Sequence, residues 1–183
     1  MTKGLIIIDV QNDYFKGGAL ELVGIEEAAK NCQLLLEKFR TAPLPIFHVQ
    51  HVSSDQGAPF FILNTKGCEI HETVQPKENE ALIIKNYPSS FRDTGLDGIL
   101  RKSGVTELVV CGAMSHMCVD TTVRAAFDLG YSCKVISDAC ATCDLEFEKR
   151  VISASLVHAS FMAALKFPFA TVLTTQEYLN EYG

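Results

Sequence analysis

Three side chains that can carry out nucleophilic chemistry stand at or just beyond the ends of predicted strands: Asp9, Lys85 and Cys118. A cysteine in the first turn of a helix is stabilised as the thiolate by the helix dipole, and a nearby ammonium lowers its pKa further. A carboxylate beside the thiol can take the thiol proton and later deliver it to a leaving group. A strand-end aspartate alone is often only a turn former. Together, the three residues predict a cysteine nucleophile served by Lys85 and Asp9.

The elements that must position these residues alternate between strands and helices. Apolar runs of strand length lie at 4–10, 46–51, 81–84, 107–111, 132–137 and 170–173. Helical spacing of apolar residues predicts helices at 25–40, 117–129 and 145–166. The long connection at 51–80 is expected to border a pocket. This alternation predicts a single α/β domain, 1–183, in three layers, with a parallel sheet and with ligands bound outside the carboxyl ends of its strands.

The composition narrows the classes of partner. The 183 residues carry a formal charge of −6, which argues against a nucleic-acid or anionic-membrane binder. The first apolar run is far shorter than a membrane span or a signal peptide. Seven cysteines are an odd number that fits reduced thiols, so a cytoplasmic protein is expected. The glycines do not form a phosphate-cradling pattern, so no nucleotide cofactor is predicted.

Three segments, in this order along the chain, carry a family resemblance. The first is the run from Leu5 to Phe15, the second is Lys85 with Ser90-Phe91 and Thr94 after it, and the third runs from Gly112 to Thr122. With these motifs the chain resembles the isochorismatase-like cysteine hydrolases over about residues 3 to 175. It looks most like the small, uncharacterised or streptothricin hydrolase-like members of that family.

The resemblance implies a six-stranded parallel sheet of order 3-2-1-4-5-6 and a catalytic triad of Asp9, Lys85 and Cys118. In the amide-cleaving members the thiolate attacks a carbonyl carbon, ammonia or an amine leaves, and water hydrolyses the thioester. By analogy, the backbone N–H groups of Met114 and Cys118 would hold the oxyanion, set by a cis peptide bond at Ala113-Met114. A small-molecule substrate and a homo-oligomer, dimer or higher, are also implied.

Departures from the family pattern bear on the substrate. The nicotinamidase branch binds a divalent metal through an Asp-x-His pair after the second strand and a further histidine. Residues 48–55 lack that pair, and His51, Asp55 and His71 have a different spacing. We therefore expect neither a metal nor another cofactor, and nicotinamide is disfavoured as the substrate.

Cys118 also bears on the choice between two reactions. Isochorismatases proper cleave a vinyl ether, which can proceed on Asp9 as general acid without a nucleophilic cysteine. The presence of Cys118 favours hydrolysis of a small amide, lactam or related C–N bond, although the thiol could be retained without being used. Vinyl-ether hydrolysis and a non-catalytic homologue remain the alternatives.

Residues near the predicted site are candidates for substrate binding because aromatic walls with a few polar groups describe most small-molecule pockets. They are Gln11, Phe15, His51, Phe60, Tyr87, Phe91 and His116. The pair Phe60-Phe61 is also consistent with plain core or a subunit contact. His158 is expected to be a hydrogen-bonded core histidine, and Cys140 and Cys143 are expected to be structural thiols.

Overall fold

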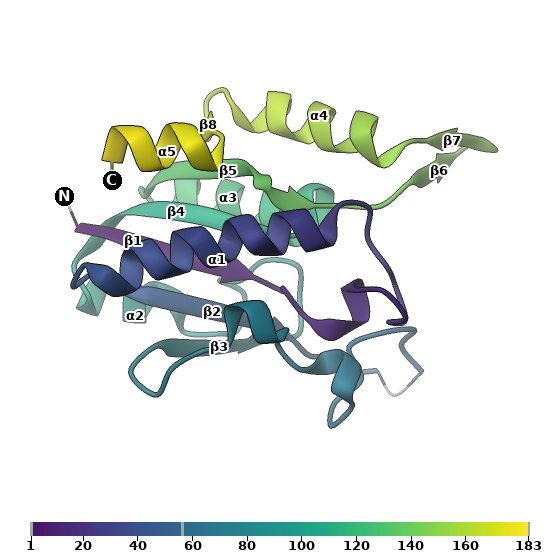
Figure 1. The fold of residues 1–183 in the computed structure, drawn as a ribbon, viewed down its shortest axis with the longest axis horizontal. Coiled ribbons are helices and arrows are strands. Elements are labelled where there is room, and N and C mark those ends of the chain that lie inside the picture. Colours follow the sequence, from purple (N-terminus) through teal and green to yellow (C-terminus); the bar gives the residue numbers. More distant parts are fainter. Residues whose placement is uncertain (1, 56, 183) are drawn as a thin grey trace.

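A parallel sheet of six strands forms the centre of the computed structural model, which describes residues 2–55 and 57–182 (Figure 1). Its strands are β1 (Thr2–Ile8), β2 (Ile46–His51), β3 (Ala81–Lys85), β4 (Val105–Ala113), β5 (Ser132–Ala141) and β8 (Thr171–Leu173). Their order is β3-β2-β1-β4-β5-β8, and every neighbouring pair is parallel. The predicted order 3-2-1-4-5-6 is confirmed, with β8 as the sixth strand of the sheet.

Helices cover both faces of the sheet, which confirms the three-layer prediction. On one face lie α1 (Ile25–Thr41) and α5 (Thr175–Tyr182), and on the other lie α2 (Leu96–Lys102), α3 (Asp120–Asp128) and α4 (Ala154–Leu165). The sequence pattern did not predict α2 or α5. Within the described ranges, no helix combines the length and apolar character that crossing a membrane requires.

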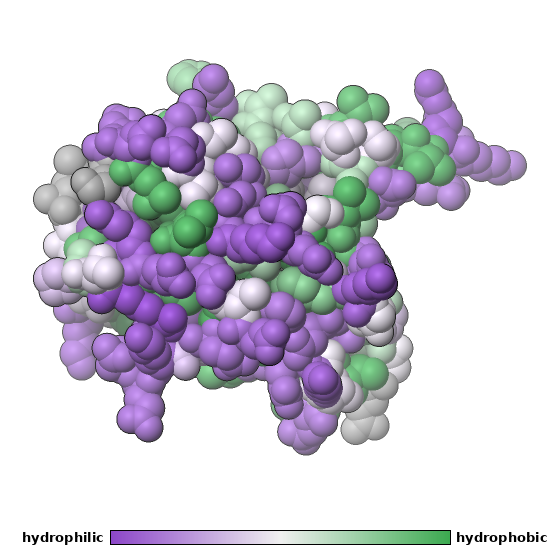
Figure 2. Space-filling view, viewed as in Figure 1, coloured by the Kyte–Doolittle hydropathy of each residue, from purple (hydrophilic) through white to green (hydrophobic). Residues whose placement is uncertain are grey.

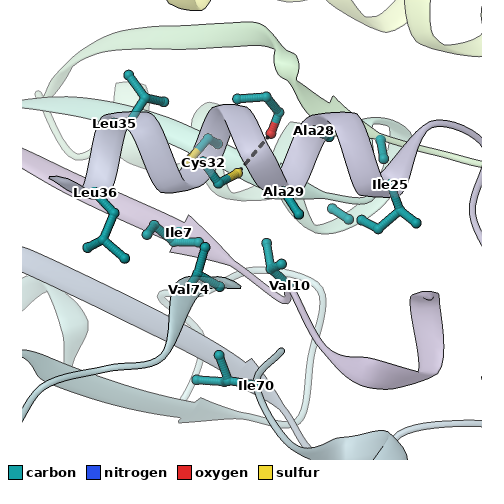
Figure 3. Packing of buried hydrophobic residues seen from close by; sticks show 14 of the residues in the cluster. Ile7, Val10, Ile25, Ala28, Ala29, Cys32, Leu35, Leu36, Ile70 and Val74 are labelled. Carbon is teal, nitrogen blue, oxygen red and sulfur yellow. Dashed lines mark hydrogen bonds between the residues drawn. The ribbon is translucent and has the colours of Figure 1, made fainter. Parts of the chain in front are cut away.

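The packing of α1 against the sheet shows why the sequence folds this way. The apolar residues predicted to share one face of this helix are its buried ones: Ile25, Ala28, Ala29, Cys32, Leu35, Leu36 and Phe39. Figure 3 shows this face above Ile7 and Val10, with the Cys32 thiol donating to the carbonyl of Ala139 at 3.3 Å. Burial of this stripe holds α1 along β1, the strand that Asp9 follows.

The segment 145–166 is not one helix, as the sequence pattern predicted. A hairpin of β6 (Leu145–Phe147) and β7 (Arg150–Ile152) projects beyond the sheet, and α4 follows it (Figure 1). The hairpin turns at Glu148 and Lys149, both at positive φ, as a two-residue β-turn requires. The Ser153 side chain then accepts from the Leu156 N–H and caps the start of α4.

The residues whose helical spacing predicted that helix are buried only in part: Phe147, Val151, Ala154, His158, Phe161 and Leu165. Phe147 and Val151 lie on the hairpin with 67% and 71% of their surface exposed. Ala154 and Leu165 are buried, while His158 is half-buried. Figure 2 shows the hairpin with apolar residues toward its base and polar residues at its tip. A spacing of four residues is typical of one face of a helix. The turn at Glu148 and Lys149 and the cap at Ser153, however, divide the segment 145–166 into a hairpin and a shorter helix.

The long connection between β2 and β3 contains two 3-10 turns, Lys66–Cys68 and Glu72–Val74. Surface cavities lie along it, one of them lined by residues 52–55 and 62–64, as predicted for this segment. At its far end the carboxylate of Glu80 accepts hydrogen bonds from the Arg40 side chain and the Lys77 N–H. Although burial opposes the change, these bonds and one to His48 lower the pKa of Glu80 to about 2.

Candidate active site

The structure brings Asp9, Lys85 and Cys118 into contact at the carboxyl edge of the sheet. The Lys85 ammonium (Nζ) lies 2.7 Å from the Asp9 carboxylate (Oδ2) and 3.2 Å from the Cys118 sulfur. All three side chains are buried, and Asp9 has no exposed surface. The three residues picked out by their types and positions therefore form one compact cluster.

The ends of neighbouring strands hold these side chains. Asp9 follows β1 with a φ of 51°, and its N–H donates to the carbonyl of Val49 on β2. Lys85 ends β3 and is the register partner of His51, which ends β2. Cys118 lies beyond β4, in a π-helical turn (Ser115–Val119) that leads into α3. Parallel strands place all of these residues at the same edge of the sheet.

Burial and charge fix the protonation of the cluster. Burial works against the ammonium of Lys85, but the charges of Asp9 and Cys118 outweigh it and raise the pKa of Lys85. Burial and the neighbouring Asp9 raise the pKa of the Cys118 thiol, which Lys85 lowers only in part. These shifts favour the charged form of Lys85 and the neutral thiol of Cys118.

Lys85 lowers the pKa of the Cys118 thiol, as expected, but burial and Asp9 outweigh this effect, so the net shift is upward and not downward. The structure places the thiol in the π-helical turn before α3, where it is buried beside a negative charge. Desolvation disfavours a thiolate there more strongly than one neighbouring ammonium favours it.

Alkylation of Cys118 by iodoacetamide is expected to show a pH midpoint above the ordinary thiol value of about 8.5. Asp9→Asn removes a negative charge beside the sulfur, so it should lower this midpoint and speed alkylation at pH 8. Peptide mass spectrometry from pH 6 to 11 measures both effects. Cys143, whose pKa is raised by burial and Asp144, is the internal control and should not respond to Asp9→Asn. A midpoint for Cys118 below 8 in the wild-type protein would contradict this assignment.

His51 is a further member of the cluster. Its ring nitrogen Nδ1 lies 2.9 Å from the Lys85 Nζ. Ligand atoms of Asp9, His51 and Cys118 lie within 4.8 Å of one another, a grouping that could hold a metal ion. The charged Lys85, however, contacts all three of them and would repel a second cation. The expectation that no metal binds here stays a prediction.

Gln11 has a positioning role in the structure and no exposed surface. Its side-chain NH₂ donates to the carbonyls of His51 at 2.9 Å and Cys68 at 2.7 Å. Its side-chain oxygen accepts from the His51 N–H at 2.8 Å. The predicted role of Gln11 in binding substrate is therefore replaced by one in tying the long connection to the end of β2.

Gln11→Ala is expected to destabilise the protein by about 2 kcal/mol or more, because it leaves the His51 N–H without its partner and removes one hydrogen bond each from the carbonyls of His51 and Cys68. Urea unfolding followed by circular dichroism measures this loss. Gln50→Ala is the matched control, since Gln50 is only half-buried and makes one bond to the same Cys68 carbonyl. Equal effects of the two variants would count against the role given to Gln11.

An aromatic cluster lies beside the site. Phe61 is buried and packs on Tyr14, Phe60 and His51, with ring centroids 4.6, 5.0 and 5.8 Å away. This supports the core interpretation for Phe61 and places the half-buried Phe60 next to the site. No functional role was predicted for Tyr14, although it lies within the first motif. Burial and the nearby Asp9 and Cys118 raise the pKa of Tyr14, which places it close to the triad.

The other predicted pocket residues are spread more widely. Phe15 stacks on His71 with centroids 3.5 Å apart, and His116 shares a hydrogen bond of 2.6 Å with Thr142. Tyr87 and Phe91 contact residues outside the Asp9, Lys85 and Cys118 cluster. Tyr87 lies under the guanidinium of Arg92, and Phe91 stacks on Tyr131. Of the predicted binding residues, His51 and Phe60 have the clearest connection to the triad.

The segment before Cys118 carries the predicted oxyanion hole. The peptide bond Ala113-Met114 is cis, as predicted. Ser115 is buried and donates to the carbonyl of Ala141, and its oxygen lies 2.8 Å from the His158 Nδ1. His158 is hydrogen-bonded, as expected, but it is half-buried and not a core residue. All seven cysteines, including Cys140 and Cys143, are free thiols. The N–H groups of Met114 and Cys118 as oxyanion donors stay a prediction.

Residues 3–177 match the model of the isochorismatase domain. The chain belongs to the isochorismatase family. An uncharacterised isochorismatase family protein of Bacillus subtilis, YddQ, is 51% identical over 98% of this chain and all of its own length. A Streptomyces noursei streptothricin hydrolase is 36% identical over 79% of this chain and 51% of its own length. This likeness bears out the resemblance seen in the sequence.

Solved structures of the family share the fold. An isochorismatase hydrolase structure from Oleispira antarctica superposes with a TM-score of 0.95 at 47% identity, covering 98% of this chain and 96% of the other. Family relatives also include proteins named as amidohydrolases. This isochorismatase-family protein is therefore a hydrolase.

Proposed function

We propose that this hydrolase cleaves a small-molecule amide, lactam or related C–N bond without a cofactor, through a thioester on Cys118. The observation that carries the proposal is the position of Lys85, whose ammonium contacts both a carboxylate and a thiol. A buried nucleophile, a proton acceptor and a fixed positive charge within one cluster are the groups that acyl transfer needs.

The reaction is proposed to begin when the Cys118 sulfur bonds to the substrate carbonyl carbon as its proton passes to Asp9. The N–H groups of Met114 and Cys118 would hold the resulting oxyanion, and losing one such donor typically costs about 100-fold or more in rate. Collapse breaks the C–N bond while Asp9 returns the proton to the leaving nitrogen. Water then attacks the thioester, giving its proton to Asp9, and the released thiolate is reprotonated from Asp9.

The ammonium of Lys85 is proposed to stabilise the charges of this catalytic cycle. Its charge keeps Asp9 and Cys118 in place and offsets the negative charge, which would reside first on the carboxylate and then on the substrate oxyanion. The raised pKa of Cys118 suits this order of events, because the proton leaves the sulfur only when a carbonyl carbon is available. A relative named ureidoacrylate amidohydrolase, 26% identical to this chain, supports cleavage of this kind of bond.

Vinyl-ether hydrolysis is the second candidate, favoured by the fully buried carboxylate of Asp9 and by the family to which the chain belongs. In that reaction Asp9 would protonate a carbon atom and Cys118 would be dispensable. The two candidates thus differ in what they require of the thiol.

Release of ammonia or amine from a panel of small amides and lactams by the purified protein tests the proposal. We expect turnover that Cys118→Ser abolishes and that Cys143→Ser, at a half-buried thiol outside the triad, retains. Isochorismate hydrolysis that survives Cys118→Ser but not Asp9→Asn would instead establish the vinyl-ether reaction. Failure to turn over either substrate class, together with an unreactive Cys118, would favour a non-catalytic homologue.

A further inference from the structure

The ammonium of Lys85 has three close partners, and the third is the ring of His51. Its Nζ lies 2.9 Å from the His51 Nδ1. A lysine ammonium only donates hydrogen bonds, so this ring nitrogen must accept. A neutral histidine whose Nδ1 accepts carries its single ring proton on Nε2. The contact with Lys85 thus fixes which nitrogen of His51 is a donor.

Several contacts hold the ring of His51 in this orientation. Gln11 binds both backbone polar groups of the residue, and Phe61 packs against the ring. Burial and the charge of Lys85 lower the pKa of His51, which keeps the ring neutral near pH 7. A donor fixed in this way loses little entropy when it binds a ligand.

The remaining ring nitrogen is available to a ligand. Within residues 2–55 and 57–182, no hydrogen bond joins the Nε2 of His51 to another group. The residue is half-buried, whereas Asp9, Lys85 and Cys118 are buried. His51 is thus the most exposed residue of the cluster, and one of its ring nitrogens lies within 4.8 Å of the Cys118 sulfur.

We propose that His51 determines specificity by donating a hydrogen bond from Nε2 to a second oxygen of the substrate, a carbonyl or carboxylate close to the scissile amide. The neighbouring Lys85 charge makes the donor a better partner for a negative oxygen than for a neutral or cationic group. This inference refines the proposed function by naming the substrate class as amides that carry an additional oxygen acceptor.

The first test determines which ring nitrogen of His51 carries the proton, in the wild-type protein and without a substrate. Nitrogen-15 NMR of the histidine rings reports which nitrogen of His51 is protonated. We expect the proton on Nε2 at pH 7 and an acceptor at Nδ1. A proton on Nδ1 would overturn the proposal whatever reaction the protein catalyses.

Binding to the inactive Cys118→Ala protein then tests the role of the donor. The probes are succinamate, an amide with a carboxylate at its far end, and butyramide, which has a methyl group there. Calorimetry should show tighter binding of succinamate. His51→Asn keeps an acceptor near the Nδ1 position but lacks the outer donor, so it should weaken succinamate binding about tenfold or more and leave butyramide unchanged.

His51→Gln extends an amide toward the Nε2 position and should restore part of the succinamate preference. No preference for succinamate, or an equal loss for both probes in His51→Asn, would overturn the proposal and leave His51 as a support for Lys85. Turnover supplies a separate readout: if succinamate binds through His51 but no amide is hydrolysed, the proposed function fails while this inference stands.

Discussion

Asp9→Asn is expected to reduce amide hydrolysis by about 100- to 10,000-fold, because the thiol of Cys118 loses its proton acceptor and the leaving nitrogen loses its proton donor. The substitution preserves side-chain shape and removes one charge. Steady-state kinetics on the best amide of the panel measures the loss. Asp93→Asn, at an exposed site with a similar positive φ, is the matched control and should retain full activity.

The same variant should be less stable, because it leaves the Lys85 ammonium buried without its counter-charge. Breaking a buried ion pair by removing one partner typically costs about 3–5 kcal/mol. Activity is therefore compared at a temperature where circular dichroism shows that the variant is folded. A folded Asp9→Asn protein with more than a tenth of the wild-type rate would rule out Asp9 as the proton carrier.

Gly112→Ala is expected to have the largest effect on folding. Gly112 lies in β4 with a φ of 118°, and a Cβ atom there would stand 2.0 Å from the carbonyl oxygen of Ile8. That oxygen belongs to the residue before Asp9, so the clash cannot be relieved without displacing the end of β1. We expect a loss of more than about 4 kcal/mol, seen as little folded protein or a much lower urea midpoint.

Gly98→Ala is the matched control for this substitution. Gly98 lies in α2, and a Cβ atom there would meet no other atom within 4 Å. The variant is expected to be more stable by about 0.5–1 kcal/mol, because alanine has the higher helix propensity. A Gly112→Ala protein as stable as the wild type would show that the ends of β1 and β4 are not as closely packed as described.

Much of the site could be predicted because its residues lie at strand ends. Asp9 follows β1, His51 ends β2 and Lys85 ends β3. Apolar runs identify such strands without knowledge of distant contacts. Parallel pairing then brings the side chains to one edge. The stripe on α1 was predictable for the same reason, since helical periodicity is a local property.

The remaining features depend on contacts between distant segments. The raised pKa of Cys118 reflects burial beside Asp9, which lies 109 positions earlier in the numbering of the chain. The side chain of Gln11 forms hydrogen bonds to His51 and Cys68, and no periodic pattern in the sequence predicts these contacts. The hairpin of β6 and β7 was missed because Phe147 and Val151 fit a helical spacing while two residues at positive φ reverse the chain.

The projecting hairpin also bears on how this chain can be modified. Its two strands pair only with each other and form no ladder with the central sheet. The tip, at Glu148 and Lys149, is exposed. An affinity tag or a fluorescent reporter inserted between these two residues would leave the packing of the core untouched. The tip is thus a suitable internal attachment point for immobilising the enzyme.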